Sequence, residues 1–300
     1  MPWAEISLTV DREHVPQAEE LLENHGALAV TLLDPVDDPV LEPPVGETPL
    51  WPVVELRALF PEHADRDGVL DAVLGLPGVS RPDAAAWTRV EDQDWERAWL
   101  DRFRPMRFGE NLWIVPTGME VPADAGQVLR LDPGLAFGTG THATTALCLD
   151  WIDSQAFAGC RVLDYGCGSG VLGIAAALKG AALVLGIDND PQALAATADN
   201  AGRNGVCDRV RCQLPDPFEP DSFDFVLANI LAAPLIDLAP RLGGCLAPGG
   251  KIVLSGILAA GQADAVAEAY APYVEHIERA ERDGWVRLTG IAPGRSGDGT

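Results

Sequence analysis

The chain has 300 residues, 47% of them hydrophobic, which is enough for two domains with sizeable cores. Its net charge is −24, from 21 Lys and Arg against 45 Asp and Glu, and a field of this sign opposes binding to a phosphate backbone. We therefore expect no direct nucleic-acid partner. The acidity suits either a basic protein partner or a salty cytoplasm, and charge alone does not separate the two.

Other classes are disfavoured by what the sequence lacks. Its apolar runs are shorter than the roughly 18 residues of a membrane span, and residues 1–5 have neither the basic region nor the apolar core of a signal peptide. The six cysteines form no CxxC pair, which argues against a zinc site and against a disulfide framework. These features predict a cytoplasmic protein with no membrane partner and no metal.

Residues 1–90 predict a small α+β domain with ferredoxin-like order β-α-β-β-α-β. Nothing in this region suggests catalysis, so we assign it to substrate recognition. The expected elements are strands at 3–10, 27–33, 53–60 and 85–90 and helices at 16–24 and 69–76.

Residues 91–127 are expected to connect this domain to a second one. Trp95, Trp99 and Phe103 recur at four-residue spacing between charged residues, which predicts an amphipathic helix over 94–103. Its aromatic face suits packing against a neighbouring domain, with substrate contact as the alternative. A short strand is expected at 112–115.

Residues 128–292 alternate apolar strands with helices, which predicts an α/β, doubly wound, Rossmann-like parallel sheet. Two further strands around Arg282-Asp283-Gly284 predict an antiparallel hairpin at one edge. Residues 293–300 are expected to be a disordered tail. The strands are expected at 162–165, 182–187, 210–214, 223–228, 251–254, 274–279 and 285–291, and helices at 171–179, 192–204, 234–246 and 262–270.

A loop rich in glycine and threonine at 131–145 precedes the first strand of this domain. Thr141 or Thr144 is expected to cap the helix that follows. Phe137 suits contact with an adenine or with a substrate arm. We expect His142 to be a hydrogen-bonding residue rather than a base, because no carboxylate partner is evident.

The first strand of the sheet leads into Asp164-x-Gly166-x-Gly168-x-Gly170, a turn that admits positive φ and close approach of a ligand. The overlapping Gly168-x-Gly170-x-x-Gly173 also matches a dinucleotide fingerprint. A carboxylate at Asp164 would repel a diphosphate but suits the amine and sulfonium of S-adenosylmethionine. Electrostatics therefore favours the methyl donor over a nicotinamide dinucleotide.

Two more polar residues end neighbouring strands. Asp188 follows the second strand, where it would bind ribose hydroxyls with either ligand, and Asn229 follows the fourth. Because carboxyl ends of parallel strands meet at one edge, Asp164, Asp188 and Asn229 are expected to form one site. Asn229 is our candidate catalytic residue, orienting an amine without acting as a base, and we predict no essential general base.

The chain resembles the PrmA family, the methyltransferases of ribosomal protein L11, over nearly its whole length. The most specific parts of the resemblance are the segments 132–142, 164–170, 186–188 and 228–232. It implies transfer of methyl groups from S-adenosylmethionine to the α-amine and lysine ε-amines of ribosomal protein L11. By the same resemblance, the donor contacts Thr145, Gly166, Asp188 and Asn229. The glycine turn itself adds Asp164 and Gly168 to the expected cofactor-binding residues. In the segment His142-Ala143-Thr144-Thr145, the family usually has proline at the position of Ala143.

Three other functions compete with this one. They are a methyltransferase acting on another protein or a small molecule, a nicotinamide-dependent oxidoreductase, and a non-catalytic adenosyl-binding scaffold that docks on the ribosome.

Overall fold

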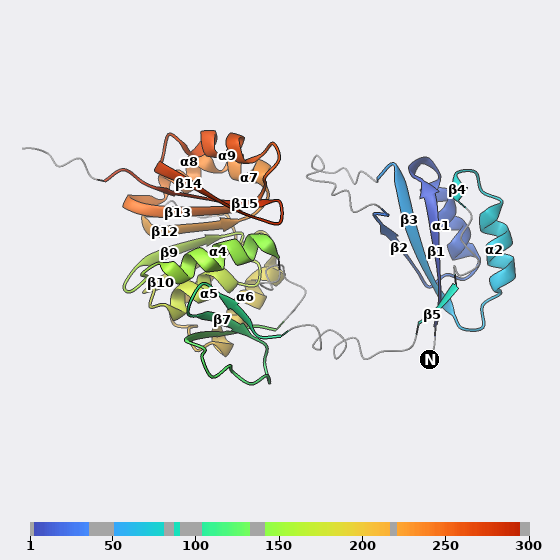
Figure 1. The fold of residues 1–300 in the computed structure, drawn as a ribbon, viewed down its shortest axis with the longest axis horizontal. Coiled ribbons are helices and arrows are strands. Elements are labelled where there is room, and N and C mark those ends of the chain that lie inside the picture. The colour runs from blue at the N-terminus through green and yellow to red at the C-terminus, as the bar shows by residue number, and fades with distance from the viewer. Residues whose placement is uncertain are drawn as a thin grey trace, which may run out of the picture. The chain divides into compact units, whose positions relative to one another are not determined.

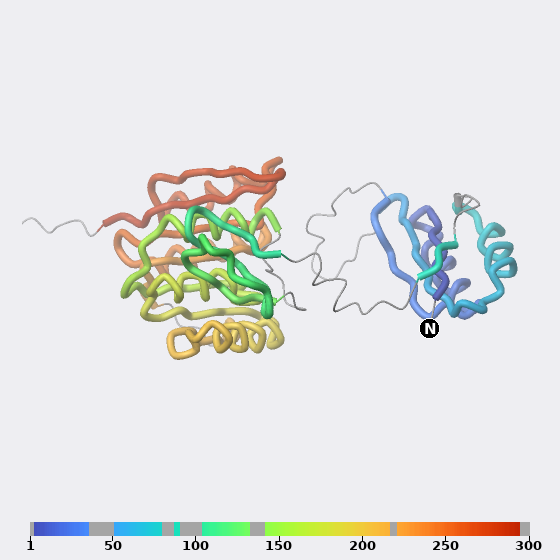
Figure 2. Tube along the Cα trace, turned by 60° about the horizontal axis from the view of Figure 1, so that its bottom comes forward, coloured from blue at the N-terminus to red at the C-terminus, as the bar shows by residue number. Residues whose placement is uncertain are grey.

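The computed structural model describes residues 3–35, 51–80, 87–90, 104–132, 142–216 and 221–294. The predicted helix at 94–103, Phe137, Thr141 and most of the predicted tail lie outside them. The chain divides into two compact units, Met1–Ala98 and Trp99–Thr300, whose traces are drawn in Figures 1 and 2. Among the helices of the described residues, none combines the length and hydropathy needed to cross a membrane.

The first unit packs two helices against one face of an antiparallel sheet (Figure 1). The sheet has the order β2-β3-β1-β4, and β5 also pairs with β1. Alternate side chains of β1 and β3 are buried, as their sequence alternation predicts. The elements are β1 (Trp3–Asp11), a 3₁₀ turn (Arg12–His14), α1 (Val15–Asn24), β2 (Ala29–Leu33), β3 (Val53–Pro61), α2 (Arg66–Leu74), β4 (Val79–Ser80) and β5 (Trp87–Val90).

The strand predicted at 85–90 is present as β5, and a further short strand, β4, precedes it. β4 pairs with Thr9 and Val10 near the end of β1, whereas β5 pairs with its beginning, at residues 3–6. Pro77-Gly78 stops the helix region early, so the chain reaches the sheet before the apolar residues that suggested a strand. Both strands lie along the same edge of β1.

The second unit is built on a seven-stranded sheet in the order β11-β10-β9-β12-β13-β15-β14. Strands β9 to β13 run parallel, while β15 is antiparallel to both β13 and β14. This confirms the Rossmann-like sheet with an antiparallel hairpin at one edge. The strands are β9 (Arg161–Tyr165), β10 (Leu183–Ile187), β11 (Val210–Gln213), β12 (Phe223–Asn229), β13 (Leu246–Leu258), β14 (Glu275–Arg282) and β15 (Trp285–Ile291).

Helices cover both faces of this sheet (Figure 1). Successive residues of β9 point to opposite faces, so Val162 belongs to one core and Leu163 to the other. The predicted helix at 234–246 is two short helices, because Pro240 occupies the first turn of the second and cannot donate a backbone hydrogen bond. The helices are α4 (Ala143–Ser154), α5 (Val171–Leu178) and α6 (Pro191–Arg203) on one face, and α7 (Ala232–Asp237), α8 (Ala239–Gly244) and α9 (Ala263–Tyr270) on the other.

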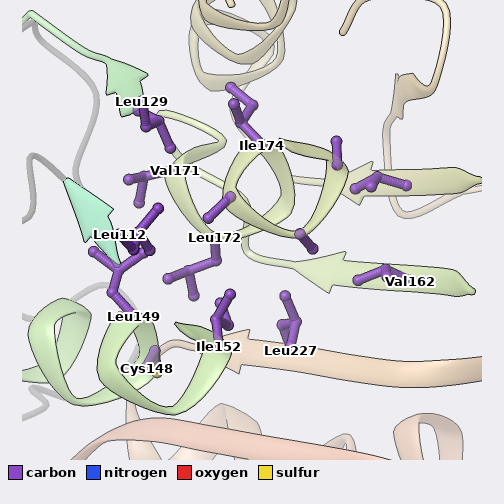
Figure 3. Packing of buried hydrophobic residues seen from close by; sticks show 14 of the residues in the cluster. Leu112, Leu129, Cys148, Leu149, Ile152, Val162, Val171, Leu172, Ile174 and Leu227 are labelled. Carbon is purple, nitrogen blue, oxygen red and sulfur yellow. The ribbon is translucent and has the colours of Figure 1, made fainter. Parts of the chain in front are cut away.

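A three-stranded sheet, β6 (Met106–Phe108), β7 (Leu112–Val115) and β8 (Gln127–Arg130), packs outside α4 and α5. Sequence analysis predicted only the middle strand and treated this segment as a connection. Figure 3 shows Leu112 and Leu129 facing side chains of α4 and α5 in one core. Asp153 of α4 also accepts hydrogen bonds from the backbone N–H groups of Glu110 and Asn111, at 2.7 and 3.0 Å. The segment is therefore part of the second unit.

Candidate active site

A cavity of about 420 Å³ opens at the carboxyl ends of the parallel strands, where the strand order reverses between β9 and β12. Ligands of open α/β sheets bind at such a switch point, and the volume suits a small molecule. The lining residues are Gly166, Cys167 and Gly168 after β9, Asp188 and Asn189 after β10, Asn229, Ile230 and Leu231 at the end of β12, Gly256 of β13, Trp285 of β15, and His142, Thr144, Thr145, Val171 and Leu172 from the starts of α4 and α5.

The glycine turn after β9 has backbone conformations that residues with a side chain adopt only with strain. Gly166, Gly168 and Gly170 have φ of 74°, 55° and 78°, all in the left-handed region. A Cβ on Gly166 would lie 2.2 Å from Cγ2 of Ile230, so the glycine also makes room for that side chain. α6 holds the turn from behind, because Thr197 Oγ1 donates to the carbonyl oxygen of Gly168 at 3.0 Å.

Asp188 presents a fixed carboxylate to the cavity. One oxygen accepts the N–H of Gly168 at 2.9 Å and the other accepts the N–H of Asp190 at 3.0 Å. Each oxygen keeps a second lone pair, so the group can still accept hydrogen bonds from a ligand. Asp190 accepts the N–H of Gln192 at 2.8 Å and so caps α6.

Asn229 is the last residue of β12. Of its two polar side-chain atoms, one has a hydrogen-bond partner among the described residues and the other does not. Its Nδ2 donates to Thr145 Oγ1 at 3.2 Å, which fixes the amide plane. Its Oδ1 is buried and has no hydrogen-bond partner among the described residues. An unpaired buried acceptor costs about 1–3 kcal/mol, so the arrangement fits a ligand that donates an N–H or O–H at this point.

His142 and Trp285 form the aromatic part of the lining. His142, not Thr144, caps α4: its Nδ1 accepts the N–H of Thr144 at 3.4 Å and lies 2.8 Å from Thr144 Oγ1. Its ring meets the Trp285 ring edge to face, with centroids 4.9 Å apart. Burial lowers the pKa of His142, which favours its neutral form near pH 7.

Comparison with known proteins identifies the family. A family model described as ribosomal protein L11 methyltransferase (PrmA) matches residues 2–292. Proteins named ribosomal protein L11 methyltransferase from Pseudomonas putida (strain W619) and Methylococcus capsulatus are 49% and 50% identical to the chain; the matches cover 97% and 96% of this chain and 99% of each relative. The chain belongs to the ribosomal protein L11 methyltransferase family.

A solved structure agrees with this membership. The ribosomal protein L11 methylase of Lactobacillus delbrueckii subsp. bulgaricus is 30% identical, with a TM-score of 0.57, over 64% of this chain and 98% of that one. As a member of the L11 methyltransferase family, the chain is a methyltransferase, and its sheet is that of a Rossmann-like class I enzyme.

In this L11 methyltransferase homologue, five of the six predicted site residues line one cavity. They are Thr145, Gly166, Gly168, Asp188 and Asn229.

Asp164 is the sixth predicted residue, and it does not line the cavity. Its side chain is 1% exposed, and Oδ2 accepts the N–H of Gly173 in the first turn of α5 at 2.8 Å. The expectation of an anionic mouth at Asp164 is therefore corrected, because the helix N-terminus draws this carboxylate into the protein. What disfavours a diphosphate is the described lining itself, which holds neither Lys nor Arg to pair with it.

Sequence analysis missed Gly256 and Trp285 as lining residues. Gly256 has φ of 86°, and a Cβ there would lie 2.1 Å from the carbonyl oxygen of Ile230. Gly166 and Gly256 thus leave room on two sides for the residue that follows Asn229. The sequence signals were the Asp283-Gly284 turn before Trp285 and a glycine just beyond the predicted strand at 251–254.

Proposed function

We propose that this methyltransferase transfers methyl groups from S-adenosylmethionine to the α-amine and the lysine ε-amines of ribosomal protein L11. The observation that carries the reaction is Asn229, which lines the cavity and whose buried Oδ1 lacks a hydrogen-bond partner among the described residues. An amine N–H is the donor it fits. The substrate follows from the family, whose named relatives match nearly the whole chain.

The residues of the cavity fit the methyl donor. Gly166 and Gly168 let a ligand approach the backbone, and Asp188 can accept hydrogen bonds from vicinal ribose hydroxyls. A diphosphate would find no Lys or Arg among the described lining residues to offset its charge, which speaks against a dinucleotide. When bound, S-adenosylmethionine supplies a methyl group already activated by its sulfonium.

The remaining task of the protein is to present a neutral amine in line with that methyl group. A lysine ammonium has a pKa of about 10.4 in water, and apolar surroundings lower it because they disfavour the charged form. Ile230 and Leu231 supply such surroundings directly after Asn229. Asn229 Oδ1 would accept one amine N–H and so direct the lone pair. Positioning of this kind can lower a barrier by about 7–11 kcal/mol.

We assign no general base to the reaction. Asn229 cannot accept the proton, and the Nδ1 of His142 is engaged by Thr144 at the start of α4. The amine is instead expected to lose its proton to water on entering the apolar part of the cavity.

For the first unit we propose a ferredoxin-like fold that recognises the substrate. Two observations support the fold: the element order strand, helix, two strands, helix, followed by β4 and β5 on one edge of β1, and the sheet order β2-β3-β1-β4. The strong acidity of the chain suits a basic protein substrate made in the cytoplasm, where we place the enzyme.

The test is mass spectrometry of ribosomal protein L11 after incubation with S-adenosylmethionine. The wild-type enzyme should add methyl groups to the α-amine and to lysines, whereas Asn229→Ala should lower the rate about 100-fold or more and keep donor affinity within about threefold. A chain lacking residues 1–90 should still bind S-adenosylhomocysteine but leave L11 unmodified. Calorimetric binding of NADH, with no binding of S-adenosylhomocysteine, would favour an oxidoreductase instead.

A further inference from the structure

The cavity has two chemically different sides. The lining from β9 and β10 contains backbone N–H groups and the Asp188 carboxylate. The lining from β12 onward contains Ile230, Leu231 and Trp285; among the described residues it holds no charged side chain, and Asn229 is its polar side chain. Asn229 lies where the two sides meet, because β12 neighbours β9 on one side and β13 on the other.

Trp285 reaches the cavity because of strand direction. β15 is antiparallel to β13, so its first residue lies at the edge where the parallel strands end. Two contacts anchor the hairpin just before that residue. The Ala259 N–H donates to the Gly284 carbonyl oxygen at 2.8 Å, and Arg282 pairs with Asp150 of α4 at 3.0 Å. The ring itself rests edge to face on His142.

Leu231 gives this side an opening to solvent. Its side chain lines the cavity and yet is 49% exposed, so a segment of a large substrate can reach Asn229 past it. A wall formed by an indole ring and a leucine side chain provides no charged partner for an ionised group. It is suited to apolar methylenes that pass along it.

We infer that Trp285 is a specificity-determining residue that, with Leu231, contacts the aliphatic stem of a target lysine. The inference rests on the proposed function and adds to it a preference between amines. A lysine ε-amine is carried on four methylenes that would lie along the indole ring when the nitrogen reaches Asn229 Oδ1. A backbone α-amine has no such stem, so it reaches the same acceptor without using this wall.

The experiment measures both kinds of amine on one substrate molecule. Full-length enzyme and ribosomal protein L11 are incubated with S-adenosylmethionine, and mass spectrometry gives the initial rate at each site. Trp285→Leu should lower kcat/KM at lysines about 10-fold, since each buried methylene is worth about fourfold, and change the α-amine rate less than about twofold. Trp285→Phe, which keeps an aromatic ring, should stay within about threefold at lysines.

Leu231→Ala and Leu214→Ala form a matched pair. Both leucines are largely exposed, at 49% and 44%, but only Leu231 lines the cavity. Leu231→Ala should slow lysine methylation about threefold, and Leu214→Ala should not change it. Equal losses at lysines and at the α-amine in Trp285→Leu, or no loss at lysines, would overturn the inference. A wild-type enzyme that modifies neither kind of amine would instead overturn the proposed function.

Discussion

The side chains of Asn229 and Thr145 are joined by a 3.2 Å hydrogen bond from Nδ2 to Oγ1, across residues from β12 and α4. Thr145 is fully buried, so its hydroxyl has a fixed position. Because the amide is planar, holding Nδ2 also holds Oδ1, the atom that lacks a partner among the described residues. The pair thus couples the cap region of α4 to the proposed amine site.

Thr145→Val should therefore slow the reaction. Valine has nearly the same shape but cannot accept from Asn229 Nδ2, so the amide is free to turn. We expect kcat to fall about 10-fold, with a loss of stability of about 1–3 kcal/mol. Thr289→Val is the control, since Thr289 is also buried but lies outside the cavity lining. Equal kcat values for the two variants would show that the hydrogen bond does not position Asn229.

Asp188→Asn should weaken binding of the donor and leave the fold intact. The change keeps the shape of the side chain but removes its charge and turns one acceptor oxygen into an NH₂ donor. Fewer lone pairs then remain for the N–H groups of Gly168 and Asp190 and for a ligand. Hydrogen bonds to a charged group are worth about 1.5–3 kcal/mol, so affinity for S-adenosylhomocysteine should fall about 10- to 100-fold by calorimetry.

Asp190→Asn is the matched control for that measurement. Asp190 neighbours the site but caps α6, and Asn caps helices about as well as Asp. Its affinity for S-adenosylhomocysteine should stay within about twofold of wild type. If both variants lose affinity alike, the effect belongs to the geometry of the turn and not to the Asp188 carboxylate.

Position along the strands was the part of the site that the sequence could predict. Asp188 and Asn229 each follow an apolar strand, and alternation of strands and helices fixes a parallel sheet, so their meeting at one edge follows from topology. The same logic predicted a hairpin around Asp283. The sequence did not show which strand β15 pairs with. Its pairing with β13 is what brings Trp285 to the cavity.

The direction of individual side chains was harder to predict. Asp164 lies at a strand end like Asp188, yet one carboxylate turns to the N–H of Gly173 and the other to that of Gly168. That choice depends on where α5 begins, within one or two residues. β6 and β8 were missed because three or four residues carry too little alternation, and their burial comes from packing on α4 and α5.

Gly166→Ala should destabilise the enzyme through two separable effects. A residue with a Cβ at positive φ costs about 1–2 kcal/mol, and the new methyl would also meet Ile230 Cγ2 at 2.2 Å. Gly159→Ala carries the first effect alone, since its φ is 77° and a Cβ there would meet nothing within 4 Å. In urea unfolding, Gly166→Ala should therefore lose about 1–3 kcal/mol more than Gly159→Ala.

Ile230→Ala, combined with Gly166→Ala, completes a double-mutant cycle. Shortening Ile230 removes the atom that the new methyl would meet, so the excess cost of Gly166→Ala should largely disappear in the double variant. The interaction energy of the cycle reports this contact alone. Simple additivity of the two substitutions would mean that Ile230 does not pack into the space left by Gly166.

Asp164 should give the stability of the second unit a distinct pH dependence. Burial raises the pKa of its carboxyl from the ordinary 3.8 to about 7, the nearby Asp188 charge adds to the rise, and the hydrogen bond from Gly173 opposes it. Between these two values the folded state holds a proton that the unfolded chain has released. Stability must then fall as pH rises through this window, by up to about 1.4 kcal/mol per pH unit.

Asp164→Asn removes this titration while keeping a carbonyl oxygen that can accept from Gly173. Urea unfolding at pH 5, 6, 7 and 8 should show the variant gaining stability relative to wild type as pH rises, by a few kcal/mol between pH 5 and pH 8. Any loss in the free energy of unfolding caused by burying the Asn amide is the same at every pH, so it shifts the whole curve of stability against pH without changing its shape. Parallel curves for the two proteins would show that the folded-state pKa of Asp164 is not raised, and that its carboxylate is stabilised by α5 as strongly as by water.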